Sequence, residues 1–145
     1  MSKVAIIDFD GTIVQHRFPL IGDPMPEAFE VMKELQAAGW ALILFTCREN
    51  DGYKISKQYL KEAVEFCKEN GVEFDAVNEA FDECEFRPEG GLKRKPYGTV
   101  MIDDRNLGGF PGWDVVRQVL LEGKEAYWYV ESEEDNSHQS TQNQE

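Results

Sequence analysis

Apolar residues in this chain form short continuous runs that alternate with segments of helical spacing. The runs are rich in aliphatic, β-branched and aromatic residues, which predicts buried strands. They lie at residues 4–7, 40–45, 72–77, 99–102 and 126–130. The segments between them repeat apolar residues at i, i+3, i+4 and i+7, which predicts amphipathic helices. These apolar positions begin at Ala28, Leu60 and Trp113.

Strands that alternate with helices predict right-handed crossovers and a parallel sheet covered on both faces. We therefore expect an α/β fold with a central, mainly parallel five-stranded sheet. The first helix follows Pro26 and stops at Gly39, and the second runs from about residue 53 to 70. Residues 13–26 read as a loop or short hairpin, and residues 78–97 as an irregular polar segment.

Length and composition indicate one soluble domain. The chain has 145 residues, of which 41% are hydrophobic and 30% charged. No apolar run approaches the length of a membrane span, and the N-terminus does not have the pattern of a secretory signal. Three cysteines without C-x-x-C spacing favour reduced thiols and a cytoplasmic location. We expect a core at residues 1–130 and a disordered, acidic and polar tail at 131–145.

The formal net charge is −13, from 15 basic and 28 acidic residues. Five of the acids fall in the predicted tail, so the core carries 15 − 23 = −8. A negative field of this size opposes a phosphate backbone, so we do not expect general nucleic-acid binding. We expect no membrane partner either.

The first strand ends abruptly in two carboxylates and a glycine, Asp8, Asp10 and Gly11. Residues i and i+2 of a strand point the same way, so both carboxylates should face one space. Their repulsion is relieved by a shared cation or by protonation of one group. The pair therefore suggests a metal site, an acid/base pair, or both, and the alternative is a pair of turn or cap residues.

Two further strands end in polar residues. The second ends at Thr46, and the fourth at Asp103 and Asp104, preceded by Lys93 and Lys95. The carboxyl ends of parallel strands meet at one edge of a sheet, where open α/β folds bind ligands. We therefore expect these side chains to gather at one edge.

This ordered series of motifs resembles the haloacid dehalogenase-like (HAD) superfamily over nearly the whole chain up to the tail. The motifs are D-x-D-G-T from Asp8, Thr46, a lysine, and Asp103-Asp104. The resemblance is closest to small capless HAD phosphatase-like proteins of bacteria and phage, because Lys95-Pro96 precedes an I-D-D-R-N run. It implies a Rossmann-like three-layer sandwich without a large cap domain. There is too little chain on either side of Thr46 for an inserted cap.

The resemblance implies a phosphate monoester hydrolase. Asp8 would be the nucleophile that forms an aspartyl-phosphate, and Asp10 would protonate the leaving oxygen and later take a proton from water. Mg²⁺ would be held by Asp8, the backbone carbonyl of Asp10 and Asp103, with Asp104 bound directly or through water. This all-oxygen set is the kind that the ion prefers. Crowded carboxylates and a phosphoryl group require such a counter-charge.

The remaining roles concern the phosphate. Thr46 would hydrogen-bond a phosphate oxygen, and Lys95 would neutralise developing charge, with Lys93 as the alternative lysine. Arg48 and Arg105 follow strand ends and are candidates for substrate contacts, or for surface salt bridges. A site without a cap would be open, suited to a macromolecular phosphorylated substrate or covered by a second copy of the chain.

Other functional interpretations stay open. A phosphotransferase would use the same residues. A receiver-type phosphoacceptor domain also combines acids, Thr and Lys, but its acidic pair comes first in the chain, whereas here the D-x-D is first and Asp103-Asp104 last. A HAD-like binding or scaffold protein without turnover is the third alternative.

Overall fold

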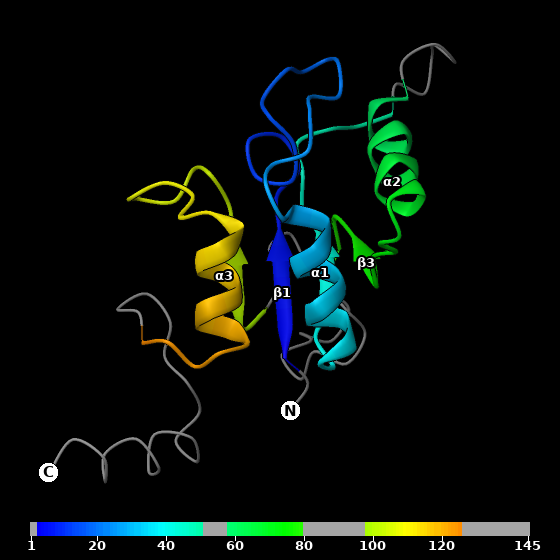
Figure 1. Cartoon of the computed structure of the whole chain (residues 1–145). Helices are drawn as coiled ribbons and strands as arrows, with labels where there is room; N and C mark the ends of the chain where they lie inside the picture. Colours follow the sequence, from blue (N-terminus) through cyan, green and yellow to red (C-terminus); the bar gives the residue numbers. More distant parts are fainter. Residues whose placement is uncertain (1–2, 51–57, 80–97, 126–145) are drawn as a thin grey trace, which may run out of the picture.

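The computed structural model describes residues 3–50, 58–79 and 98–125. Within them the chain forms four strands and three helices (Figure 1). The strands are β1 (Val4–Ile7), β2 (Ala41–Leu44), β3 (Ala76–Val77) and β4 (Val100–Ile102). The helices are α1 (Ala28–Ala37), α2 (Tyr59–Glu69) and α3 (Trp113–Leu120). No helix among the described residues is long and apolar enough to cross a membrane.

The four strands form one parallel sheet in the order β3-β2-β1-β4. The predicted α/β fold with a parallel sheet is therefore confirmed for the described residues. Ile7 at the end of β1 lies opposite Leu44 of β2 and Ile102 of β4, so the three strands end level. The pairing continues for one step, because the Asp8 amide donates to the Ile102 carbonyl at 3.0 Å. Whatever follows these strands must therefore meet at one edge.

Both faces of the sheet are buried. Alternate residues such as Ala5 and Ile7 belong to the main hydrophobic core beneath the helices. Ile6 and Ile43 face the other way and are only 3% and 0% exposed. Burial on both faces explains why these strands read as continuous apolar runs instead of alternating ones.

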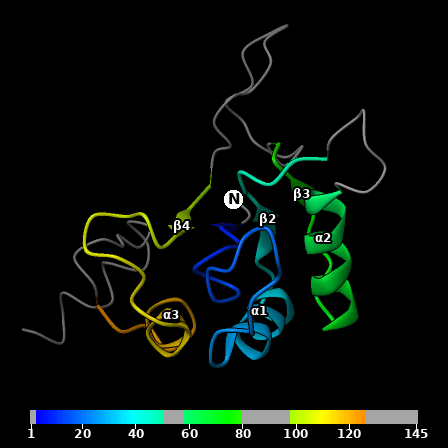
Figure 2. The same ribbon diagram turned by 90° about the horizontal axis from the view of Figure 1, so that it is seen from above.

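The described helices lie together on one face of the sheet (Figure 2). α1 and α3 run side by side, and Arg117 of α3 makes ion pairs of 2.7 Å with Glu27 and Glu34 at α1. α2 adjoins the other flank of α1, where Phe66 meets Phe29 edge to face at 5.9 Å between ring centroids. The second helical layer of the expected three-layer sandwich is not formed by the described residues.

Two expected elements differ in extent. The strand predicted at 72–77 is reduced to Ala76–Val77, because the preceding residues close α2 and turn the chain. Gly71 adopts a φ of 89° that favours glycine, and the Val72 amide returns to the Cys67 carbonyl at 2.9 Å. The second helix begins at Tyr59, later than the expected start at about residue 53, and Gln58 before it has a non-helical backbone and pairs with Asn50 in an antiparallel bridge. The fifth strand predicted at 126–130, the tail and residues 53–57 lie outside the described residues.

The segment after β1 folds into a tight turn around one carbonyl group. The amides of Ile13 and Val14 both donate to the Phe9 carbonyl, at 3.0 and 3.2 Å. Val14 then pairs with Pro24 in an antiparallel bridge, so the segment at residues 13–26 is a wide loop closed at its base. The buried Trp113 indole at the start of α3 donates to the Thr12 carbonyl at 2.7 Å. α3 is thereby attached to the turn that carries the D-x-D motif.

This attachment predicts the effect of replacing Trp113. Trp113→Phe keeps an aromatic ring but leaves the buried Thr12 carbonyl without its donor. We expect a loss of about 1–3 kcal/mol in the free energy of unfolding, measured by urea denaturation. An unchanged free energy of unfolding would show that this hydrogen bond does not stabilise the turn.

Candidate active site

Three carboxylates from two neighbouring strand ends lie together. Asp8 follows β1, and Asp103 and Asp104 follow β4. One oxygen from each residue can be chosen such that all three lie within 4.8 Å of one another. Each residue is partly buried. The expected gathering at the carboxyl edge of the sheet is present because β1 and β4 are adjacent and in register.

The backbone comes unusually close to this cluster. Gly11 has a φ of 86°, and a Cβ built there would collide with the Asp104 carboxylate. Glycine is therefore required for two reasons, its left-handed conformation and the space that Asp104 occupies. One oxygen of Asp104, Oδ1, is buried without a hydrogen-bond partner in the described part of the chain.

The burial and crowding of Asp8 raise the pKa of its carboxyl. The pKa is raised from the ordinary 3.8 to about 8, and burial is the largest cause. A hydrogen bond with the Asp104 side chain and the charges of Asp103 and Asp104 contribute to this rise, while a hydrogen bond from the Phe9 backbone opposes it. In the absence of a cation, the surroundings of Asp8 therefore favour the protonated form of its carboxyl.

These observations fit a divalent cation. The donors are all carboxylate oxygens, which Mg²⁺ prefers. The cluster also combines excess negative charge with a buried oxygen that has no hydrogen-bond partner among the described residues. Asp8, Asp103 and Asp104 are the side chains that would hold the ion. The predicted contribution of Asp10 was its backbone carbonyl, and that stays a prediction.

The side chain of Asp10 is engaged elsewhere. Its two carboxylate oxygens accept hydrogen bonds from Arg48, from Nε at 2.7 Å and from Nη2 at 2.8 Å. The Arg48 side chain is 1% exposed and that of Asp10 is 14% exposed. This pair is a buried, two-pronged salt bridge, not the surface bridge that was one interpretation of Arg48.

Thr46 lies at the end of β2 and is held on both sides. Its amide donates to the Asn78 side-chain oxygen at 2.8 Å, and its hydroxyl accepts from the Arg48 amide at 3.1 Å. The hydroxyl proton is then free to donate to a ligand. Asn78 has a φ of 53°, a conformation that asparagine tolerates better than most residues.

One cleft of about 350 Å³ brings most of the predicted residues together. Its polar walls are Asp8, Asp10, Thr46, Arg48, Asp103 and Arg105, and its apolar walls include Phe18 and Phe45. His16 and Cys47 also border it. Lys93 and Lys95 lie outside the described residues, so the choice of a phosphate-binding lysine stays a prediction.

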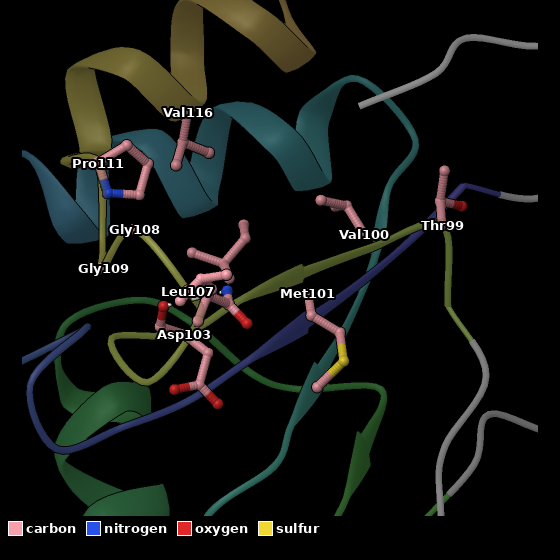
Figure 3. Close-up of a pocket in the computed structure, with 11 residues that line it drawn as sticks. Thr99, Val100, Met101, Asp103, Leu107, Gly108, Gly109, Pro111 and Val116 are labelled. Atoms are coloured by element: carbon pink, nitrogen blue, oxygen red, sulfur yellow. Dashed lines mark hydrogen bonds between the residues drawn. The ribbon is translucent and has the colours of Figure 1, made fainter. Parts of the chain in front are cut away.

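A second cavity, of about 420 Å³, lies beside β4 under the loop that leads to α3 (Figure 3). Val100, Met101 and Pro111 line it, and Asp103 is the one carboxylate among the described residues that border it. Asp103 therefore borders both cavities. Asp8 borders the smaller cleft together with Asp10 and Thr46, so this cleft is the candidate active site.

Sequence reasoning missed two features of this site. Asn78 was placed in an irregular segment, although an asparagine directly after an apolar run is a signal for a strand-end turn. The ion pair between Arg48 and Asp10 joins residues 38 positions apart, and a local sequence pattern cannot predict such a pairing.

Comparisons with known proteins add a family but not an activity. Neither a protein-family model nor a curated protein matches the chain. A solved structure of a D,D-heptose 1,7-bisphosphate phosphatase from B. bronchiseptica, in complex with magnesium and phosphate, is 18% identical. The match covers 64% of this chain and 55% of that one, with a TM-score of 0.40. We base no inference on a likeness this weak.

The fold and the site define an α/β protein with a parallel sheet and an acidic cluster at its carboxyl edge. A solved structure of a conserved protein from Bacteroides thetaiotaomicron is 38% identical and has a TM-score of 0.72. The match covers 86% of this chain and 94% of that protein. The chain belongs to the same family as this conserved Bacteroides protein.

The close contact between Gly11 and Asp104 can be tested by two matched substitutions, Gly11→Ala and Gly39→Ala. Gly39 has a similar φ, 93°, but a Cβ there meets nothing within 4 Å. Gly39→Ala should lower the free energy of unfolding by roughly 1–2 kcal/mol, which is the cost of a left-handed backbone conformation for a residue that has a Cβ. Gly11→Ala should cost more and should also reduce the rise in melting temperature caused by Mg²⁺, because Asp104 is displaced. Equal effects of both changes on stability and on the Mg²⁺ response would contradict the close packing.

The raised pKa of Asp8 predicts a pH-dependent response to Mg²⁺. Between pH 4 and 8 the folded state binds more protons at Asp8 than the unfolded state, so this contribution to stability falls as pH rises. Mg²⁺ requires the ionised carboxylates, so its binding should strengthen over the same range. At a Mg²⁺ concentration of about 100 times Kd, the melting temperature should rise by roughly 5–10 °C.

The measurement is thermal unfolding with Mg²⁺ and with chelator at about pH 5.5 and about pH 8.5. The Mg²⁺-induced rise should be larger at the higher pH, and Asp8→Asn should remove most of that difference. The same Mg²⁺-induced rise at both pH values in the native chain would contradict the assignment of Asp8 as a ligand.

Proposed function

We propose that the chain is a Mg²⁺-dependent phosphate monoester hydrolase of the HAD-like type, with Asp8 as nucleophile. One observation carries the proposal. Asp8, Asp103 and Asp104 offer oxygens within 4.8 Å of one another, at the edge of a cleft that Asp10 and Thr46 also line. A nucleophile, a cation site, an acid/base group and a phosphate-binding hydroxyl are thus collected in one place.

In the first step, an Asp8 oxygen attacks phosphorus. The bond between phosphorus and Asp8 forms, and the bond between phosphorus and the leaving alcohol breaks. Asp10, two residues on and in the same cleft, gives its proton to the leaving oxygen. In the second step, water attacks the aspartyl-phosphate, Asp10 takes the proton from that water, and inorganic phosphate leaves with Asp8 restored.

The other residues supply charge and orientation. When bound, Mg²⁺ would offset the negative charge of Asp8 and of the phosphoryl oxygens. Asp103 and Asp104 would hold the ion together with Asp8, and the Asp103 carboxylate accepts a hydrogen bond from the Arg105 amide at 2.8 Å. The free Thr46 hydroxyl proton is suited to a phosphate oxygen. Lys95 remains the proposed second cation.

The substrate is a phosphomonoester whose class is set by the cleft. A cleft of about 350 Å³ accommodates a phosphate and a small group, or the phosphorylated end of a larger molecule. Exposed Arg105 and half-exposed Phe18 at its rim would contact the alcohol portion. A phosphotransferase would differ only in the acceptor of the second step.

The proposal predicts metal-dependent turnover that requires Asp8. Purified chain should hydrolyse members of a panel that runs from para-nitrophenyl phosphate to sugar phosphates, nucleotides, phosphopeptides and end-phosphorylated oligonucleotides. Turnover should need Mg²⁺, stop with chelator, and be lost in Asp8→Asn, which is nearly isosteric with the native side chain. Full turnover by Asp8→Asn would exclude Asp8 as the nucleophile.

A phosphate analogue separates the enzyme from the binding-protein alternative. Beryllofluoride with Mg²⁺ should raise the melting temperature of the native chain but not that of Asp8→Asn, because the analogue occupies the place of the phosphoryl group on Asp8. No change in the native chain, together with no turnover, would favour a scaffold without catalysis.

A further inference from the structure

Arg48 is the most fully engaged charged side chain near the cleft. Besides its two hydrogen bonds to Asp10, it donates from Nη2 to the Leu20 carbonyl at 2.9 Å and from Nη1 to the Pro19 carbonyl at 3.4 Å. The guanidinium carbon also lies 5.0 Å from the ring centroid of Phe9 and 5.1 Å from that of Phe18. Arg48 therefore joins the end of β2 to Asp10 and to the loop that follows β1.

These contacts leave Arg48 little capacity for a substrate. A guanidinium has five N–H donors. The Nε donor, both Nη2 donors and one Nη1 donor are used in the contacts above. The side chain is 1% exposed, so only the second Nη1 donor remains for a phosphate unless Asp10 or the loop carbonyls are displaced.

We propose that Arg48 is a positioning residue that acts through Asp10 and does not bind the substrate phosphate. This inference rests on the proposed hydrolase function. A carboxylate has about four lone-pair positions, and Arg48 occupies one on each oxygen. The remaining positions are free to carry the proton that passes to the leaving oxygen. Arg48 fixes where those positions point, and the loop carbonyls fix Arg48.

The inference predicts that the effect of replacing Arg48 on kcat/KM depends on the leaving group of the substrate. A good leaving group such as para-nitrophenolate departs without a proton, whereas a simple alcohol needs one from Asp10. The value of kcat/KM reports the steps up to departure of the alcohol, since later hydrolysis is common to all esters. A residue that orients Asp10 should therefore matter for alkyl phosphates and hardly at all for aryl phosphates. A phosphate contact would matter equally for both.

The experiment compares kcat/KM for para-nitrophenyl phosphate and for an alkyl phosphate in the native chain, Arg48→Lys and Asp10→Asn. Lysine keeps the charge but not the two-pronged geometry. In Arg48→Lys we expect a loss of roughly 100-fold or more for the alkyl ester, against less than about threefold for the aryl ester. Adding Arg48→Lys to Asp10→Asn should produce little further loss, because the two residues act as one unit.

Two controls guard against a general effect on folding. Arg117 also makes two ion pairs, with Glu27 and Glu34 on the surface, and Arg117→Lys should leave the ratio of aryl to alkyl kcat/KM unchanged. Beryllofluoride with Mg²⁺ should raise the melting temperature of Arg48→Lys as much as that of the native chain. A reduced response to the analogue would place Arg48 at the phosphate.

The outcomes separate the inference from the function on which it rests. Equal loss for both esters in Arg48→Lys, or additive losses in the double variant, would overturn the positioning role and leave the hydrolase intact. Absence of turnover of either ester by the native chain would overturn both. A selective loss for the alkyl ester with an unchanged analogue response would establish Arg48 as the residue that orients Asp10.

Discussion

The repulsion among three carboxylates at one edge of the sheet is the constraint on which the site depends. Register between β1 and β4 makes the contact unavoidable, because Asp8 and Asp103 follow strands that end level with each other. Without a cation such a cluster is unfavourable. Burial of Asp8 and repulsion within the cluster raise the pKa of Asp8 and favour its protonated form. The sheet thus places several negative charges at one defined point. A divalent cation bound there would offset more of this charge than a single proton.

The surroundings of the cluster keep those charges from moving apart. Gly11 allows the backbone to pass directly against Asp104, and Trp113 fixes the same turn from α3 through the Thr12 carbonyl. Arg48 restrains the neighbouring Asp10 from the side of β2. These are long-range contacts between separate elements, so the site is preorganised by the fold and not by its own loop.

The sequence predicted the features that depend on local pattern. Apolar runs and helical spacing gave the parallel sheet and the three helices, and the strand-end acids predicted the cluster of Asp8 with Asp103. The ion pair of Arg48 with Asp10 could not be predicted, because it depends on which residues lie close together in the folded chain. From the sequence alone, both a substrate contact and a salt bridge fit the position of Arg48. The length of β3 was overestimated because Val72 is apolar for another reason, to close α2 against the core. Lys95 and the fifth strand lie outside the described residues.

The hydrogen bond from the Thr46 amide to the Asn78 side chain makes the position of Thr46 depend on β3, the shortest of the described strands. β3 pairs with β2 over only two residues, and the Thr46 amide is protected by the Asn78 side chain, not by a neighbouring backbone carbonyl. Fraying of β3 from the sheet edge would free that amide to exchange its hydrogen with solvent while β1 and β4 stay paired. The Thr46 side of the candidate site therefore has a local stability separate from that of the Asp8 and Asp103 side, and we expect the Thr46 side to open first.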